Sequence, residues 1–86
     1  MTYSVAVTNS FRKDERKLDS KTRTRMYRTI AQIAEDPYSY KELQGQLKNL
    51  RSARFGDFRI IYRINTQQNI VELIAVGLRQ RILNQD

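Results

Sequence analysis

The chain has 86 residues, of which 40% are hydrophobic and 29% are charged, so its composition is that of one folded domain (residues 1–86). With 16 Lys and Arg against 9 Asp and Glu, the net charge of +7 favours a polyanionic partner: nucleic acid, a ribosome surface or an acidic protein. Cys and His are both absent, which excludes disulfides, the usual zinc sites and catalytic pairs built on these residues.

No metal and no other cofactor is expected, because the carboxylates are scattered and the three glycines do not form a phosphate loop. The start of the chain does not follow a signal-peptide pattern, and no apolar run approaches the roughly 20 residues of a membrane span. A cytoplasmic protein is therefore expected.

A strand is predicted over residues 2–7, where β-forming residues alternate between two faces. The TNS stretch at residues 8–10 offers N-caps, because its side-chain oxygens can accept from free backbone N–H groups at a helix start. A short helix is predicted over residues 11–18, with Phe11 and Leu18 two turns apart on one face.

A second helix is predicted from the capping residues Asp19 and Ser20 to about Glu35. Its apolar residues have the i, i+4, i+7, i+8 spacing of a core-facing stripe: Met26, Ile30, Ile33 and Ala34. The opposite face is polar: Lys21, Arg25, Arg28 and Gln32. Pro37 ends the helix, because it disfavours helical backbone at the preceding residue. The two helices are close enough in sequence to form a helical hairpin.

Three further strands are predicted after a connecting segment over residues 38–47. They cover residues 50–55, 58–65 and 70–78, with turns at Gly56-Asp57 and at NTQQN. The predicted fold is therefore α+β in the order βααβββ: a small antiparallel sheet with the helical hairpin packed on one face.

The strand over residues 58–65 separates its arginines from its core residues. A period of two places one set toward the helices: Phe58, Ile60, Tyr62 and Ile64. Arg59, Ile61 and Arg63 fall on the open face, where Arg54 and Arg79 are expected to converge. Guanidinium groups suit phosphate oxygens. The pattern fits an anion-binding face, but equally a solvated face, with Arg54 and Arg63 paired to Glu72 as a further alternative.

Four stretches of the chain follow one another in a known order: FRKDERKL, EDP, ELQGQLKNLRSARFGDFRIIYRI and IVELIAVGLRQ. Together they resemble the RelE/ParE superfamily of toxins from bacterial and archaeal toxin–antitoxin pairs. The resemblance covers nearly the whole chain, and RFGDFRIIYRI is its most specific part. It implies the same βααβββ fold.

For the RelE-like branch, the resemblance implies a metal-independent mRNA endonuclease that acts in the ribosomal A site and inhibits translation. The substrate's 2′-hydroxyl attacks the adjacent phosphate, while basic side chains stabilise the charge that develops. Arg59 matches the arginine of the family motif G-[DN]-[YF]-R and is implied to stabilise the transition state. Arg79 matches the arginine near the leaving oxygen, and Arg54 matches a basic phosphate contact before the turn. Other basic residues are assigned to binding nucleic acid or the ribosome: Lys48, Arg51, Arg63 and Arg81.

The chain departs from the family pattern where proton transfer is expected. Leu78 stands where a His is common, and Leu83 where a C-terminal Tyr is common. Leu50 and Ser52 occupy positions where RelE-like toxins carry lysines. Tyr62 is no substitute, because its parity places it in the core. Acid–base catalysis is worth about 10²–10⁴-fold, so its loss implies a slow enzyme or a non-enzyme.

Three functions therefore stay open from the sequence. The arginine-rich hairpin favours a RelE-like mRNA endonuclease, whereas the missing His and Tyr favour a ParE-like inhibitor of DNA gyrase. A member that only binds an antitoxin or RNA is the third. In each case the implied partner is a small acidic antitoxin, whose helix or strand would cover the basic, partly apolar face.

Overall fold

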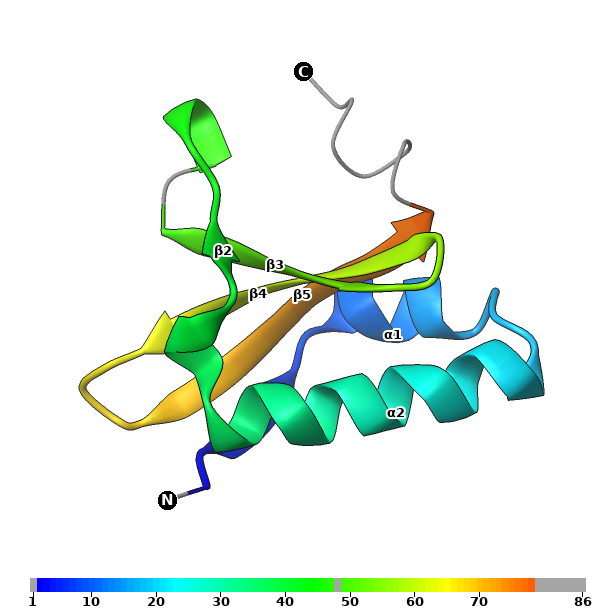
Figure 1. Ribbon diagram of the computed structural model, residues 1–86, viewed down its shortest axis with the longest axis horizontal. Helices are drawn as coiled ribbons and strands as arrows, with labels where there is room; N and C mark the ends of the chain where they lie inside the picture. Colours follow the sequence, from blue (N-terminus) through cyan, green and yellow to red (C-terminus); the bar gives the residue numbers. More distant parts are fainter. Residues whose placement is uncertain (1, 48, 79–86) are drawn as a thin grey trace.

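The computed structural model describes residues 2–47 and 49–78, and these form two helices packed on one face of a five-stranded sheet (Figure 1). In chain order the elements are β1 (Ser4–Val7), α1 (Asn9–Glu15), α2 (Ser20–Glu35), η1 (Pro37–Ser39), β2 (Lys41–Glu42), η2 (Gly45–Leu47), β3 (Leu50–Phe55), β4 (Phe58–Asn65) and β5 (Ile70–Leu78). The predicted α+β class and the order of its main elements are confirmed.

The sheet is mixed, with the strand order β1-β5-β4-β3-β2. Strands β2 to β5 pair antiparallel, but β1 runs parallel to β5. Two helices separate β1 from the remaining strands, so β1 reaches the sheet by a crossover rather than a hairpin. The sheet expected to be antiparallel therefore contains one parallel pair.

A short strand, β2, lies within the segment predicted to be a plain connection. Lys41 pairs with Ser52, and Glu42 pairs with Arg51. Two residues are too few for an alternating pattern to be visible, which is why this strand was not predicted.

Helix α1 begins at Asn9, two residues earlier than expected, because Thr8 is its cap. The Thr8 hydroxyl accepts a hydrogen bond from the backbone N–H of Phe11 at 3.2 Å. The helix ends at Glu15, yet Leu18 beyond it is still buried. Helix α2 begins as predicted, because the Asp19 carboxylate accepts from the backbone N–H of Thr22 at 2.8 Å.

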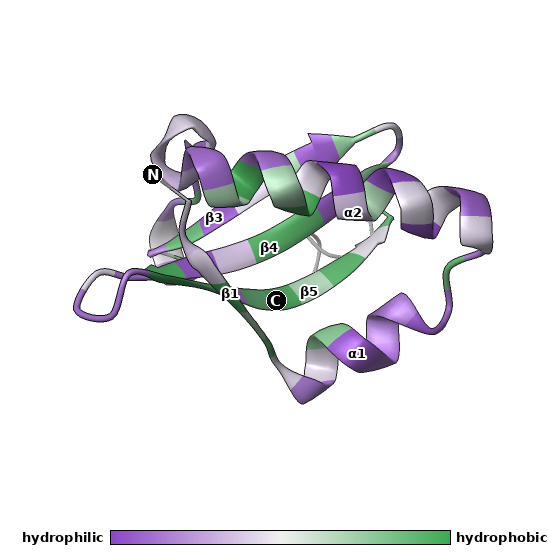
Figure 2. Cartoon of the chain, turned by 90° about the horizontal axis from the view of Figure 1, so that it is seen from below, coloured by the Kyte–Doolittle hydropathy of each residue, from purple (hydrophilic) through white to green (hydrophobic). Residues whose placement is uncertain are grey.

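The core lies between the helices and the strands above them. The predicted stripe of α2 is confirmed, with Met26 and Ile33 fully buried and Ile30 packed against the core from its margin. Figure 2 shows the apolar stretches of β4 and β5 behind α1 and α2. The sheet contributes these buried residues: Ala53, Phe55, Ile60, Tyr62, Val71, Leu73 and Val76.

Strand β5 contains an irregularity that the sequence pattern did not indicate. Ile61 is paired with Ala75, but its neighbour Tyr62 is paired with Leu73, so Ile74 is an extra residue in β5. This bulge reverses which side of the sheet the following residues of β5 face.

Candidate nucleic-acid interface

The side of the sheet turned away from α1 and α2 carries a group of polar and basic side chains, which we call the arginine face. It comprises Lys41 of β2, Ser52 and Arg54 of β3, Arg59, Ile61 and Arg63 of β4, and Glu72 of β5. Directly paired residues project to the same side of an antiparallel sheet, and the alternate residues of these strands are in the core. The prediction that Arg59 and Arg63 share one face is confirmed.

Arg59 lies near the middle of the arginine face and is held in place by a neighbouring strand. Its Nη1 donates a hydrogen bond to Ser52 Oγ over 2.7 Å. Ser52 and Ile61 beside it are only 5% and 4% exposed. The centre of this face is therefore a protected environment rather than the open surface that was predicted, and Arg59 is half-buried in it.

Arg54 is paired directly with Arg59 across the hairpin. Like charges in directly opposed positions destabilise a strand pair. Arg54 is exposed, and its Nε lies 3.5 Å from the carbonyl oxygen of Gly56. Within residues 2–47 and 49–78 the ion pairs are Arg51–Glu42 and Arg63–Glu72, so no acid there neutralises Arg54. A bound anion would offset this repulsion.

Arg63, two residues further along β4, has a different environment. It is paired directly with Glu72, and the two side chains form an ion pair with an Nη2–Oε1 distance of 2.7 Å. Its Nε donates to the same oxygen at 2.8 Å. The ion-pair alternative considered for Arg54 and Arg63 thus holds for Arg63 alone.

Arg51 faces the helices, because it is paired with Tyr62. Its Nη1 donates to the carbonyl oxygen of Tyr40 at 2.7 Å, and its guanidinium carbon lies 5.4 Å from the centre of the Tyr38 ring. These contacts fasten the segment after α2 to the sheet. Its binding of nucleic acid stays a prediction.

Three of the predicted site residues, Lys48, Arg79 and Arg81, lie outside the described residues. Leu78, where the family pattern has a His, is described and is 43% exposed at the end of β5.

Lys41 belongs to the arginine face but was not predicted from the sequence. It is exposed and paired with Ser52, the residue that holds Arg59. Only the pairing of β2 with β3 brings it there. In the sequence it is one basic residue beside Glu42 in a segment without a period, so no local signal marks it.

Tyr62 is in the core, as predicted. It is 0% exposed, and its hydroxyl donates to the carbonyl oxygen of Pro37 at 2.6 Å. Burial raises the pKa of Tyr62. A hydroxyl that is buried, protonated and already donating cannot serve as a proton acceptor for the arginine face.

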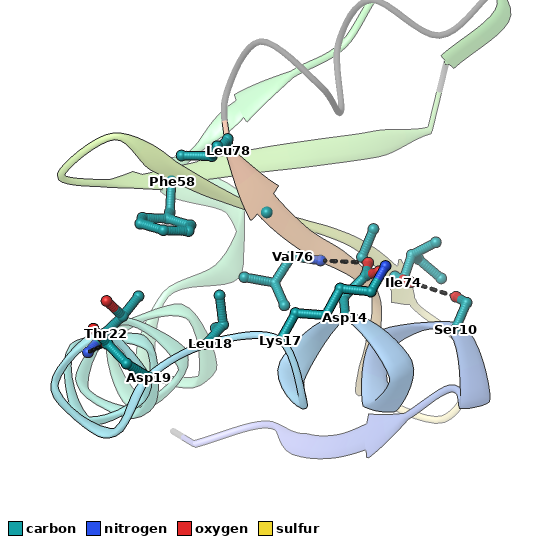
Figure 3. A pocket seen from close by; sticks show the side chains of 12 residues that line it. Ser10, Asp14, Lys17, Leu18, Asp19, Thr22, Phe58, Ile74, Val76 and Leu78 are labelled. Atoms are coloured by element: carbon teal, nitrogen blue, oxygen red, sulfur yellow. Dashed lines mark hydrogen bonds between the residues drawn. The ribbon is translucent and has the colours of Figure 1, made fainter.

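A cleft opens beside the end of β5, between the two helices (Figure 3). Strand β1 pairs only with residues 70–73 of β5, so side chains of α1 contact the edge beyond it. Ser10 Oγ donates to the carbonyl oxygen of Ile74 at 2.6 Å, and the backbone N–H of Val76 donates to Asp14 Oδ2 at 3.1 Å.

The two carboxylates of this cleft, Asp14 and Asp19, both accept from backbone N–H groups. The hydrogen bonds from Thr22 lower the pKa of Asp19. The Asp19 carboxylate therefore serves as the cap of α2.

The described part of the chain gathers no three His, Cys, Asp or Glu side chains that could hold a metal ion. None of its helices is both long and apolar enough to cross a membrane.

Comparison with known proteins identifies the family. The family model for the ParE toxin of type II toxin–antitoxin systems, parDE, matches residues 5–83. The curated toxin RelE of Mycobacterium tuberculosis (strain ATCC 25618 / H37Rv) is 30% identical over 79 residues, which are 90% of this chain and 81% of that relative. The chain belongs to the RelE/ParE toxin superfamily. It is a toxin of a toxin–antitoxin system.

Solved structures share the toxin's fold. A chain of the toxin–antitoxin complex RelBE2 from Mycobacterium tuberculosis superposes with a TM-score of 0.86 at 27% identity, covering 92% of this toxin and 100% of that chain. A chain of the intact RelBE toxin–antitoxin complex from E. coli gives a TM-score of 0.77 at 22% identity, with 88% and 95% covered. The second similarity concerns the fold alone.

Proposed function

We propose that this toxin is a RelE-like, ribosome-dependent mRNA endonuclease that inhibits translation. The observation that carries the proposal is the direct pairing of Arg54 with Arg59 on the face away from the helices. Two opposed guanidinium groups repel each other in the free protein and bind an anionic phosphate jointly. The hydrogen bond from Arg59 to Ser52 fixes one of them in advance, as electrostatic catalysis requires.

In the proposed reaction the 2′-oxygen of the substrate forms a bond to the adjacent phosphorus, and the bond from phosphorus to the 5′-oxygen breaks. Arg59 stabilises the negative charge on the phosphate oxygens, and Arg79 is proposed to lie near the leaving oxygen. Arg54 and Lys41 hold the flanking backbone. The remaining predicted residues contact nucleic acid or the ribosome: Lys48, Arg51, Arg63 and Arg81.

Proton transfer in this reaction is left to water or to the substrate. Arginine stays protonated in proteins and does not act as a base, and Tyr62 is buried. General acid–base catalysis contributes about 10²–10⁴-fold where it operates, so we expect a slow enzyme.

Induced expression followed by mapping of mRNA ends tests the proposal. We expect cuts within translated codons, and a drop of at least about 10²-fold in cleavage for Arg59→Ala, because one preorganised charge is lost. Arg12→Ala, which removes an exposed arginine from α1, is the matched control and should cleave normally. Equal cleavage by both variants would contradict the assignment of Arg59.

A ParE-like inhibitor of DNA gyrase is the second candidate. It is favoured by the family model, which describes ParE toxins, and by the absence of His from the whole chain. A supercoiling assay with purified gyrase separates the two. Toxicity with intact mRNA and inhibited gyrase would overturn the endonuclease proposal.

We propose a small acidic antitoxin as the partner in the cytoplasm. The similar structures from Mycobacterium tuberculosis and E. coli are toxin–antitoxin complexes, and a net charge of +7 favours an acidic partner. If a short reading frame beside the gene encodes an acidic protein, co-expression of that protein should suppress toxicity. Toxicity that persists while this acidic protein is stably expressed would count against its role as the antitoxin.

A further inference from the structure

The turn between β3 and β4 is contacted by arginines from both layers of the fold. Gly56 in this turn has a φ of +57°, and a Cβ added there would lie 2.7 Å from Nη2 and 3.2 Å from Cζ of Arg25. The Arg25 guanidinium of α2 therefore lies against the glycine. From the arginine face, Arg54 Nε lies 3.5 Å from the carbonyl oxygen of the same residue.

The glycine allows this arrangement in two ways. Its positive φ is a conformation that L-residues with side chains rarely adopt. Its missing side chain also leaves the space that the Arg25 guanidinium occupies. Gly56 thus lets a cation from the helix layer reach the tip of the hairpin.

Both cations at the tip are accessible. Arg25, Arg54 and the turn residue Asp57 are all exposed. In the part of the chain that the structure describes, neither arginine belongs to an ion pair, since those pairs join other arginines to Glu42 and Glu72.

The tip is continuous with the arginine face. Arg54 is paired with Arg59, and α2 runs alongside β3 and β4 (Figure 2). A line of positive charge therefore leads from Arg59 through Arg54 to Arg25. The turn residues themselves, Gly56 and Asp57, are not hydrophobic, although Leu78, which is paired with Phe58 beside the turn, is 43% exposed.

We propose that Arg25 and Arg54 form a phosphate-binding site at the hairpin tip, which takes the sugar–phosphate backbone of an RNA strand continuing from the arginine face. The site rests on the proposed function and extends it to a residue of α2. Guanidinium groups suit phosphate because they donate bidentately to its oxygens. The two guanidinium groups lie on either side of Gly56, which has no side chain to separate them.

Binding of a short single-stranded RNA tests this site. The probe carries 2′-O-methyl groups throughout, so it has no nucleophile and cannot be cleaved. Fluorescence anisotropy over a range of salt concentrations gives the affinity and its salt slope. Arg25→Ala and Arg54→Ala should each weaken binding several-fold and reduce the slope by about 0.7, the value for one phosphate contact on a single strand.

Arg28→Ala is the matched control, because it removes the same charge from an exposed position on the same helix. It should leave the slope unchanged. Arg25→Met keeps an unbranched stem beside Gly56 without the charge, and should behave like Arg25→Ala while preserving the fold.

Several results would overturn the site. One is an equal loss of RNA affinity in Arg25→Ala and Arg28→Ala, which would show that binding depends on the total positive charge and not on a site at the tip. Another is a lower melting temperature of Arg25→Ala with an unchanged salt slope of RNA binding, which would give Arg25 a structural role alone. If Arg25→Ala and Arg54→Ala bound RNA as tightly as the unaltered toxin but bound polyglutamate more weakly, the tip would instead be a site for an acidic protein. Failure of the unaltered toxin to bind the RNA would overturn the site as well. RNA binding that depends on Arg25, without mRNA cleavage in cells, would leave the site standing and overturn the endonuclease proposal.

Discussion

At the scale of single residues, the arginines of β4 differ because of the residue placed directly opposite each one. Arg63 is paired with Glu72, which neutralises its charge through an ion pair. Arg59 is paired with Arg54 on β3 and with Gly77 on β5. The same side chain on the same face therefore lies opposite an acid at one position and opposite a second arginine at the other.

Tyr62→Phe separates structure from chemistry at the core. The substitution removes the hydroxyl that donates to the buried Pro37 carbonyl, so we expect the free energy of unfolding to fall by about 1–2 kcal/mol. Denaturant unfolding measures the loss. Tyr27→Phe, at a residue 53% exposed, is the control with a smaller expected loss. Toxicity should be unchanged, and a toxin inactivated by Tyr62→Phe at full stability would instead make Tyr62 catalytic.

At the scale of elements, α1 protects the part of β5 that β1 does not cover. Ser10 and Asp14 bind a carbonyl oxygen and an N–H group of β5 beyond the last residue paired with β1. Exposed strand edges promote pairing with other chains, and polar side chains placed along them oppose it. The short helix thus serves the sheet edge as well as the core.

The cap of α2 gives stability a dependence on pH. The hydrogen bonds from Thr22 lower the folded-state pKa of Asp19 from its ordinary value of about 4. A lowered carboxylate pKa contributes stability above the unfolded pKa, and this contribution is lost as pH falls through the folded pKa.

Asp19→Asn keeps the capping oxygen but does not titrate, so it isolates this effect. The melting temperature of the unaltered toxin should therefore fall relative to that of Asp19→Asn as the pH drops below about 4. Thermal unfolding monitored by circular dichroism from neutral to acidic pH measures the difference. Parallel curves across the whole range would show that Asp19 is not a charged cap.

At the scale of the whole molecule, a small domain with a charge of +7 is stabilised by a ligand that neutralises it. A ligand that binds only the folded state adds about 2.7 kcal/mol at a concentration of 100 Kd. We expect single-stranded RNA to raise the melting temperature at low salt, and added salt to remove the rise, because phosphate contacts are screened. Differential scanning fluorimetry measures the melting temperature with and without the RNA. A rise that persists at high salt would indicate a contact that is mainly apolar.

The main elements and much of the arginine face could be predicted from the residue pattern. The spacing of Met26 and Ile33 showed which side of α2 is buried, and Gly56 marked the hairpin turn. Period two placed Arg59 and Arg63 on one face. These features depend on residues close together in the chain, where backbone geometry is enough to relate them.

Which charged residues lie side by side could be learned from the folded structure alone. It brought Lys41 beside Ser52 through a two-residue strand, matched Arg63 with Glu72, and laid Arg25 against Gly56. It also set β1 parallel to β5 and inserted the bulge at Ile74. Each of these depends on strand register or layer packing between distant segments. Local periodicity indicates which face a residue takes, but not which residue of a distant segment lies beside it.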